Sequence, residues 1–469
     1  MTEQLWKKSA LELAAGIREK SFSSQEVVAA HLERIAEVNG EINAIIDVLA
    51  DDAQAGARLA DKAIARGDQI GALHGVPFTI KTNIDVAGQA TTNGIPLLAD
   101  AIAPSDSPVV ERMKGAGAIP LGRTNMPDMG LRIHTDSSLF GRTKNPWDLE
   151  RTAGGSSGGE GAALASGMSP IGLGNDIGGS LRNPAHACGI AAIKPTQGVV
   201  PDADTYPTPD HSLSAQIMLQ QGVMARSISD VRAGFEIVAG WHPRDPISVP
   251  ASLTDLMPGQ KLRIAVMANP PGGSTHPDVA AAVSASADAL SDAGHEVITV
   301  TPPDYELSLL LWCMMLFPDF HDLRNQLDVV MGEGGTKLIE QVVELFPTMT
   351  SLEKYLAHQA RDGVGRKWQE WFEEFPILLS PTWTQPAFVK DFDIATAEGS
   401  MATLELMRPV LPGNLLGLPC AVVPGGMADD LPVGVQVIGR RYSDLRVLSI
   451  AEQIEESFGT ITPIDPRTN

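Results

Sequence analysis

The sequence predicts a single α/β domain of 469 residues. Residues 262–267 have the pattern of an apolar strand, residues 278–293 that of a helix, and residues 296–300 that of a second strand, with Gly294 placed to end the helix. A strand, a helix and a strand in this order form one β-α-β unit, the building block of parallel sheets. The chain also has no low-complexity linker, internal repeat or long charge block that would mark a domain boundary.

The N-terminal part of the chain predicts an amphipathic helix. Ser23 and Glu26 have the spacing of a capping box, in which each side chain satisfies a free backbone N–H at the start of a helix. Val28, Leu32 and Ile35 then recur at helical spacing. We therefore expect a helix that begins at this box and has one apolar face.

The C-terminal part predicts a strand followed by a helix. Residues 433–438 are mostly β-branched and apolar, which favours a strand. Ser443 is predicted to cap the helix that follows, in which Val447, Ala451 and Ile454 share one face. Both ends of the chain therefore agree with the α/β class.

The longest apolar run, residues 307–317, contains 11 residues and ends at Pro318. A helix needs about 20 apolar residues to cross a bilayer, so this run is too short to do so. Two interpretations stay open: a buried helix, or a lid or wall of a substrate pocket.

The most informative feature of the sequence is a pair of glycine-rich segments that contain serine. Residues 154–159 read GGSSGG and residues 176–182 read DIGGSLR, which places Ser156 and Ser180 24 positions apart. Glycine costs conformational entropy and packs no side chain, so two such segments indicate that a small molecule approaches the backbone closely. Their unobstructed N–H groups can stabilise an oxyanion. The structural alternative is a tight turn in which Ser157 caps a following helix.

A lysine upstream of these segments, Lys81, follows an apolar strand. Val76, Phe78 and Ile80 alternate before it and would carry it into the interior. Because lysine has a reference pKa of about 10.4, a lysine that acts as a base near neutral pH needs a pKa lowered by roughly 3, which burial can supply. The structural alternative is an ordinary lysine at a strand end that extends to water.

Together these three segments resemble the amidase signature family, hydrolases that use a Ser-Ser-Lys triad. In that family a lysine ends an apolar strand, GGSSGG follows, and a D-x-GGS-x-R segment comes after it, as in this chain. The resemblance extends over residues 124–126, 140–141, 145–147, 188–190, 194–196, 414–419 and 431–436. Three ordered motifs at the family's spacing are far more specific than a single glycine-rich run.

The resemblance implies one large domain in which a mixed twisted β-sheet lies between helices. We therefore expect an amidase domain over residues 1–469. Within it, we expect a signature core at about residues 70–200, a variable region at about 205–400 that builds the substrate pocket, and a return to the core at about 410–460. The variable region matches the family only loosely.

The resemblance also implies the role of each residue of the triad. Lys81 corresponds to the base, Ser156 to a proton relay, and Ser180 to the nucleophile that becomes acylated. The family holds the peptide before the relay serine in the cis form, which is here the Gly155–Ser156 peptide.

Further site residues follow from the same resemblance. The oxyanion hole would be the backbone N–H groups of Ile177, Gly178, Gly179 and Ser180. Three residues would support the loop without reacting: Ser157, Asp176 and Arg182. The segment on the acyl side of the substrate would be Met129, Gly130 and Leu131.

A different hydrolase class fits part of the same segment. Both Ser156 and Ser157 match the G-x-S-x-G nucleophile elbow of α/β-hydrolases, which needs a histidine and an acid after the serine. His186 lies too close in sequence to complete that order, and the later histidines have no matching context. The elbow also leaves Lys81 and the second Gly-Gly-Ser unexplained.

Cofactor chemistry is disfavoured by the motifs that the chain lacks. It has no G-x-x-x-x-G-K-[ST] segment and no G-x-G-x-x-G after a strand, which disfavours nucleotide binding. His134 and Asp136 are close in sequence, but no H-x-x-x-H or Cys/His cluster accompanies them. We expect neither a metal nor a cofactor.

Composition limits the partners of this chain. A net charge of −22 argues against an independent nucleic-acid binder. Three cysteines give no disulfide framework, and Cys188 is expected to be a core residue. Residues 1–16 lack the pattern of a signal peptide. We expect a cytoplasmic protein with a small-molecule amide substrate and no membrane span, and leave a homodimer open.

Two functions remain within the family. One is a stand-alone amidase of neutral, apolar amides or anilides, extended to esters and carbamates. The other is the glutaminase (A) subunit of a tRNA-dependent glutamyl or aspartyl amidotransferase, in which an acid seven positions before the N-L-x-G-L-P segment holds the amino group of glutamine. Here Met407 occupies that place, and residues 204–214 lack the serine-rich signature of that glutaminase. Both departures favour the stand-alone amidase.

Overall fold

A large mixed sheet organises the computed structural model, which describes residues 4–205 and 211–467. Within these residues the sheet has 11 strands. From one edge to the other they are β1 (Ile45–Val48), β3 (Ile119–Thr124), β2 (Pro77–Lys81), β8 (Ile171–Asp176), β10 (Gln220–Ala225), β9 (Ala191–Lys194), β14 (Cys420–Ala428), β15 (Leu431–Gly439), β13 (Ile377–Pro381), β11 (Arg263–Val266) and β12 (Glu296–Thr299). Strands β3, β2 and β8 run parallel, as do β13, β11 and β12, and the other neighbours are antiparallel. The predicted mixed sheet is confirmed.

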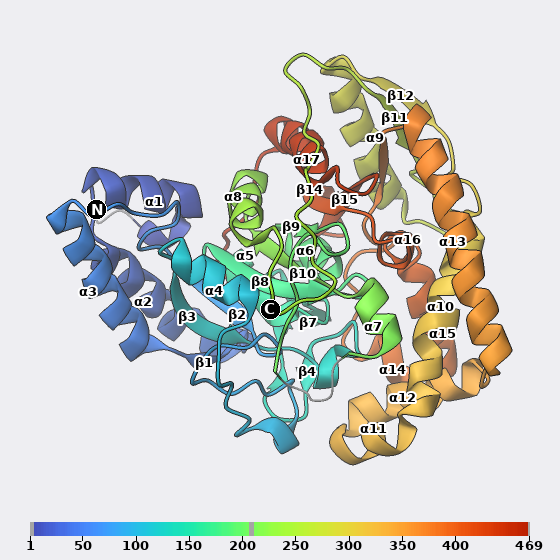
Figure 1. Ribbon diagram of the computed structural model, residues 1–469, viewed down its shortest axis with the longest axis horizontal. Coiled ribbons are helices and arrows are strands. Elements are labelled where there is room, and N and C mark those ends of the chain that lie inside the picture. Colours follow the sequence, from blue (N-terminus) through green and yellow to red (C-terminus); the bar gives the residue numbers. More distant parts are fainter. Residues whose placement is uncertain (1–3, 206–210, 468–469) are drawn as a thin grey trace.

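Helices cover both faces of this sheet and extend beyond its ends (Figure 1). They are α1 (Ala10–Glu19), α2 (Ser24–Ile42), α3 (Ala50–Arg66), α4 (Pro108–Gly115), α5 (Gly158–Ala165), α6 (Arg182–Cys188), α7 (Leu213–Met218), α8 (Ile228–Val238), α9 (Pro277–Asp292), α10 (Tyr305–Asp322), α11 (Arg324–Val330), α12 (Glu333–Leu345), α13 (Ser351–Glu374), α14 (Phe392–Ala395), α15 (Ala397–Leu406), α16 (Leu411–Leu415) and α17 (Asp444–Phe458). Short 3-10 turns are η1 (Leu5–Lys7), η2 (Pro96–Leu98) and η3 (Asp128–Gly130), and two small ribbons pair β4 (Asp136–Ser137) with β5 (Gly141–Arg142) and β6 (Lys144–Asn145) with β7 (Asp148–Thr152).

The two faces of the sheet bury different apolar clusters. On one face, α1, α4, α8, α9 and α17 pack against alternate strand residues such as Phe78, Ile80 and Ile193. On the other face, α2, α3, α5 and α6 pack against residues such as Ala192. A third cluster fills the space between α10, α12, α13 and α16, at the end of the molecule opposite α1–α3 (Figure 1). Since side chains alternate along a strand, this division is what a sheet covered on both faces requires.

The predicted local elements are present, with one correction. The capping box of Ser23 and Glu26 is formed at the start of α2. Strands β11 and β12 are parallel neighbours joined through α9, and Gly294 has the positive φ of a helix-terminating glycine. Ser443 does stand at the start of α17, but its hydroxyl donates to the Arg440 carbonyl oxygen and makes no capping bond.

The apolar run at residues 307–317 lies in α10, which continues past Pro318 to Asp322. The helix is buried along one side, including Trp312, Met315 and Phe317, whereas Leu310 is exposed. Within the described residues, no helix is long and apolar enough to span a membrane.

Candidate active site

Sheet topology brings the two sequence motifs together. Strands β2 and β8 are parallel neighbours, so their C-terminal ends, at Lys81 and Asp176, lie at the same edge of the sheet. The DIGGSLR segment begins with the last residue of β8, and the two serines of GGSSGG directly precede α5. The side chains at 79 and 81 share the face of β2 that α5 covers, because Phe78 and Ile80 point into the cluster on the other face.

Lys81 is fully buried and contacts Ser156. Its Nζ donates to Ser156 Oγ at 2.7 Å and to Asn175 Oδ1 at 2.7 Å. The alternative of a strand-end lysine that extends to water is therefore wrong. Because Asn175 offers an acceptor to the amine, a neutral lysine can donate an N–H there and direct its lone pair at the serine hydroxyl.

The environment of Lys81 favours the neutral amine. Burial lowers the pKa of Lys81 to about 7, although the negative charges of Asp176 and Glu160 act in the opposite direction. Desolvation disfavours the charged form of a lysine, and here it outweighs the attraction of both carboxylates. A substantial fraction of Lys81 is therefore neutral near pH 7.

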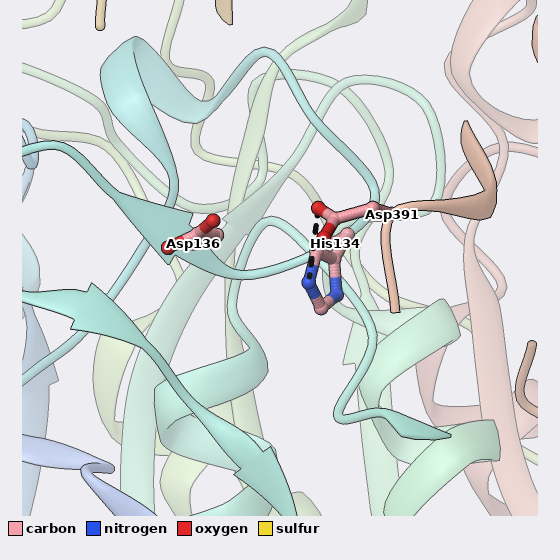
Figure 2. A group of neighbouring side chains, drawn as sticks. All are labelled: His134, Asp136 and Asp391. Atoms are coloured by element: carbon pink, nitrogen blue, oxygen red, sulfur yellow. Dashed lines mark ion pairs between the residues drawn. The ribbon is translucent and has the colours of Figure 1, made fainter. Parts of the chain in front are cut away.

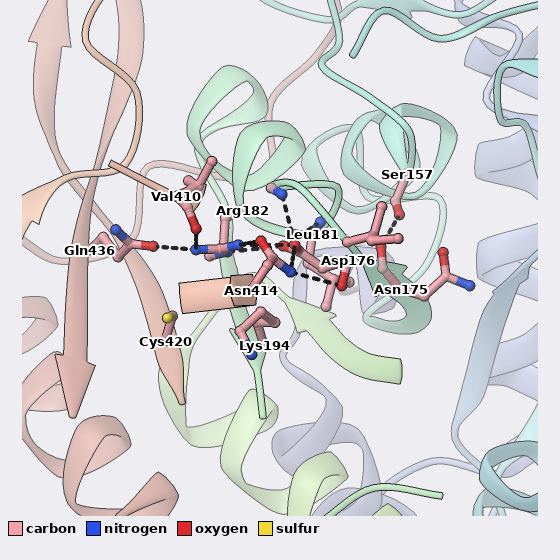
Figure 3. A network of polar contacts seen from close by, with 12 residues as sticks. Ser157, Asn175, Asp176, Leu181, Arg182, Lys194, Val410, Asn414, Cys420 and Gln436 are labelled. Carbon is pink, nitrogen blue, oxygen red and sulfur yellow. Dashed lines mark hydrogen bonds and ion pairs between the residues drawn. The ribbon is translucent and has the colours of Figure 1, made fainter. Parts of the chain in front are cut away.

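Asp176 and Arg182 form a fully buried ion pair beside this site (Figure 3). The guanidinium donates to Asp176 Oδ2 from Nε and to Oδ1 from Nη2, both at 2.9 Å. It also donates to the Val410 carbonyl oxygen and to Gln436, while Asn414 Nδ2 donates to Asp176. Burial alone would raise the pKa of Asp176, but the charge and hydrogen bonds of Arg182 hold it well below its usual range.

The ion pair fixes the loop that carries Ser180. Asp176 accepts hydrogen bonds from the N–H groups of Gly179 and Leu181, at 2.7 and 3.1 Å. The Gly179 N–H is thus already used, which differs from its expected place in an oxyanion hole. Within the described residues, no group accepts a hydrogen bond from the N–H of Ile177, Gly178 or Ser180.

The GGSSGG segment has the geometry implied by the resemblance. The Gly155–Ser156 peptide is cis. Ser157 occupies the position before α5 but does not cap it; its hydroxyl donates to the Asn175 carbonyl oxygen at 3.4 Å, and its N–H donates to the Ser180 carbonyl oxygen at 3.2 Å (Figure 3). The turn alternative, in which Ser157 caps a helix, is therefore wrong.

The nucleophile-elbow alternative also lacks its histidine in the expected place. His186 is buried, with Nε2 bonded to the Gln385 carbonyl oxygen and Nδ1 accepting from the Gly434 N–H. Both ring nitrogens are thus held by the backbone and neither contacts a serine of GGSSGG.

The expected acyl-side segment lies next to Ser156. A Cβ atom at Gly130 would stand 3.4 Å from Ser156 Oγ, so the backbone passes directly beside the relay serine. Both Met129 and Gly130 have positive φ, which turns the chain sharply at this point. Leu131 then lines a cavity.

This cavity is mostly apolar and adjoins the Ser180 loop. Its walls are Leu131, Ile133, Trp312, Leu316, Phe317, Phe320, Leu338, Val342, Leu345, Phe346, Asp393, Ser400, Thr403, Leu404 and Met407. Trp312 Nε1 donates to the Ile177 carbonyl oxygen at 2.9 Å. A Cβ at Gly178 would stand 2.7 Å from the Trp312 ring and 3.3 Å from Met407. The apolar run of α10 is therefore both a buried helix and a wall of this cavity.

Three possible metal ligands gather near the acyl-side segment: His134, Asp136 and Asp391 (Figure 2). Arg132 already supplies a positive charge there, since it pairs with Asp391 at 3.0 Å and with Asp393 at 2.8 Å. Burial, followed by the charge of Arg132, lowers the pKa of His134 to about 4, so the imidazole is neutral at pH 7. We interpret the cluster as an ion-pair network that ties the acyl-side segment to α14.

Sequence reasoning missed two residues of the site. Asn175 directly precedes the DIGGSLR segment and Glu160 directly follows GGSSGG, yet neither was predicted to belong to the site. Glu160 is fully buried, and burial raises the pKa of its carboxyl group to about 7. A charged residue type inside an Ala- and Gly-rich helix was the signal that could have revealed it.

Comparison with known proteins agrees with this geometry. The family described as Amidase matches residues 26–448. The chain is 40% identical to an indoleacetamide hydrolase of Bradyrhizobium diazoefficiens over 97% of this chain and 88% of that protein. It is 32% identical to the (A) subunit of the glutamyl-tRNA(Gln) amidotransferase of Salinispora tropica, over 97% and 98% of the two chains. A crystal structure of a bacterial aryl acylamidase of the amidase signature family superimposes with a TM-score of 0.82 at 26% identity, covering 96% of each chain.

These matches span nearly the whole chain and agree with the lysine, GGSSGG and DIGGSLR segments on which the resemblance rested. The chain therefore belongs to the amidase signature family and is an amidase, a hydrolase of carbon–nitrogen bonds in amides.

Proposed function

We propose that this protein is a stand-alone, serine-dependent amidase that forms an acyl-enzyme at Ser180, with Lys81 as base and Ser156 as relay. The observation that carries the proposal is the buried contact of 2.7 Å between Lys81 Nζ and Ser156 Oγ. A lysine whose pKa is about 7 can accept a proton at neutral pH, which an ordinary lysine does poorly.

The reaction begins when Lys81 accepts the proton of Ser156 while Ser156 Oγ accepts the proton of Ser180. Ser180 Oγ then bonds to the amide carbon, and the carbonyl oxygen becomes an oxyanion. When the carbon–nitrogen bond breaks, the proton returns from Lys81 through Ser156 to the leaving nitrogen. Water attacks the acyl-enzyme by the same route, releases the acid and restores Ser180.

The oxyanion hole in this proposal is smaller than the four N–H groups expected from the resemblance. The N–H of Gly179 holds Asp176, so we assign the hole to Ile177, Gly178 and Ser180. Backbone donors that are fixed before the reaction stabilise the developing charge without reorganisation. The Asp176–Arg182 pair supplies that rigidity, and we assign Asp176, Arg182 and Ser157 a supporting role.

The acyl group of the substrate is neutral and apolar in this proposal. Trp312 and Met407 contact both the Ser180 loop and the apolar cavity, so an acyl chain bound at Ser180 can extend along them. Burial of apolar surface contributes about 25 cal/mol per Å², which favours an aryl or indolyl group over a small polar one. Met129, Gly130 and Leu131 would line the start of this path.

The relatives' names are consistent with this substrate class, since one is an indoleacetamide hydrolase and another an aryl acylamidase. Most cavity residues fall within 205–407, which supports the assignment of substrate choice to the variable middle of the chain. Esters and carbamates present the same kind of carbonyl carbon to Ser180 and belong to the proposal.

The alternative is the glutaminase of an amidotransferase, because relatives of that kind match over the whole chain. Binding of free glutamine requires an acid for its amino group. The acid of the cavity, Asp393, is paired with Arg132 through two hydrogen bonds of 2.8 and 2.9 Å, and Met407 stands where the acid of the glutaminase is expected. These contacts favour the stand-alone amidase.

Direct competition tests the proposal. Purified protein, without any partner protein, would be assayed with indole-3-acetamide, an aryl anilide, an aryl carbamate and L-glutamine, with Ser180→Ala as the control. We expect a higher kcat/KM for the aromatic amides than for glutamine, and none of these activities in Ser180→Ala. Efficient glutamine hydrolysis without turnover of the aromatic amides would favour the amidotransferase glutaminase.

A further inference from the structure

Glu160 is a fully buried carboxyl group that the proposed reaction does not use. It lies in the first turn of α5, which is otherwise built of glycine, alanine and leucine. A buried carboxyl group is costly unless specific partners satisfy it, so its position requires a reason.

The partners of Glu160 belong to the two strands around Lys81. Thr79 Oγ1 donates to Glu160 Oε1, and Thr124 Oγ1 donates to Oε2 at 2.9 Å. Thr79 is two residues before Lys81 on the same face of β2, and Thr124 is the β3 residue paired with Lys81. Glu160 thus holds residues on two sides of the lysine.

The sheet is opened at this point to admit the carboxyl group. Gly172 of β8 is paired with Thr79, and a Cβ at Gly172 would stand 1.8 Å from Glu160 Oε1. Any other residue at 172 would therefore displace the carboxyl group. The glycine, the two threonines and the glutamate form one built site, which we call the Glu160 site.

We propose that Glu160 is a positioning residue for the Lys81–Ser156 pair: it fastens the helix that follows the relay serine to the strands that flank the lysine, and it places a negative charge near the amine. The inference rests on the proposed role of Lys81 as base. Its geometric basis is that α5 begins two residues after Ser156 and reaches β2 and β3 through this one side chain.

The charge acts on the lysine in a defined direction. A carboxylate at 160 favours the protonated form of Lys81, and the positive lysine in turn favours the carboxylate. The two groups therefore titrate as a coupled pair near pH 7. Removal of the negative charge should make Lys81 lose its proton at lower pH.

The other charged or titratable groups on the elements packed around α5 do not replace this charge. They are Asp176 on β8, which is paired with Arg182 on α6; His186 on α6, whose pKa burial lowers to about 4; Arg123 on β3, which donates to the carbonyl oxygens of Lys81 and Ile84; and the exposed Asp47 on β1. The one further carboxylate that acts on Lys81 is Asp176, and it is held by Arg182.

Glu160→Gln tests the inference because glutamine keeps the size and can still bond both threonine hydroxyls, but carries no charge. We expect the acidic limb of the kcat/KM–pH profile to move to lower pH, by on the order of one pH unit. Thr124→Val is the second variant: it removes one donor, makes the carboxylate less favourable, and should shift the limb by less in the same direction. Thr82→Val is the matched control, since Thr82 is buried beside Lys81 but does not contact Glu160.

The outcomes separate this inference from the proposed function. An acidic limb in Glu160→Gln identical to that of the wild type would overturn the role of Glu160 alone. If Glu160→Gln does not fold, Thr124→Val decides, and a limb equal to that of Thr82→Val and the wild type overturns it. Full activity in a Lys81→Met variant would overturn the lysine as base, and the Glu160 inference with it.

Discussion

The pH dependence of catalysis follows from the burial of Lys81. An ordinary lysine with a pKa of about 10.4 has roughly one neutral molecule in 2,500 at pH 7, whereas a lysine with a pKa of about 7 is half neutral. Burial therefore increases the amount of base by about 10³-fold. We expect kcat/KM for an aromatic amide, measured from pH 5 to 9.5, to rise with unit slope below about pH 7 and to level off above it.

Two lysine variants sharpen this test. Lys81→Met should lower kcat/KM by roughly 10³-fold while circular dichroism remains that of the folded protein. Lys194 is also buried, which lowers its pKa to about 8, but its Nζ donates to the Pro195 carbonyl oxygen at 2.7 Å. Lys194→Met should keep an acidic limb near pH 7. A flat profile in the wild type, or a limb that disappears only in Lys194→Met, would refute the reasoning.

Three further substitutions test other parts of the site. Arg182→Met leaves the buried Asp176 without its partner and should destabilise the fold by about 3–5 kcal/mol, so a thermal melt unchanged from the wild type would contradict the supporting role of the pair. Met407→Glu places an unpaired carboxylate against the apolar cavity and should lower kcat/KM for an aromatic amide about 10-fold or more; an unchanged value would place the acyl group elsewhere. Trp312→Phe keeps the aromatic wall but removes the hydrogen bond to the Ile177 carbonyl oxygen, worth about 1 kcal/mol, so kcat/KM should fall about 5-fold, and equal kinetics would show that this bond does not hold the loop.

The sequence was most informative where local rules determine the structure. The capping box at Ser23, the β-α-β unit around α9 and the terminating Gly294 depend on residues close in the chain, and all three are present. The resemblance added what local rules cannot supply, namely the order of the strands that brings Lys81 beside Ser156.

Long-range contacts account for what sequence reasoning missed. Asp391 lies far along the chain from Arg132, and Glu160 far from Thr79, so no spacing rule joins them. Hydrogen-bond competition accounts for the rest: the Gly179 N–H was expected in the oxyanion hole, but Asp176 accepts it. Ser443 likewise has a capping position, yet a carbonyl oxygen within reach takes its hydroxyl proton.

Covalent labelling of Ser180 tests the central claim most directly. The protein would be treated with a fluorophosphonate, followed by intact-mass measurement and peptide mapping, with Ser180→Ala as the control. We expect one adduct per chain, on Ser180, and none in the control variant, because Lys81 and Ser156 activate that hydroxyl alone. An adduct on Ser156 or Ser157 would contradict the assignment of the nucleophile.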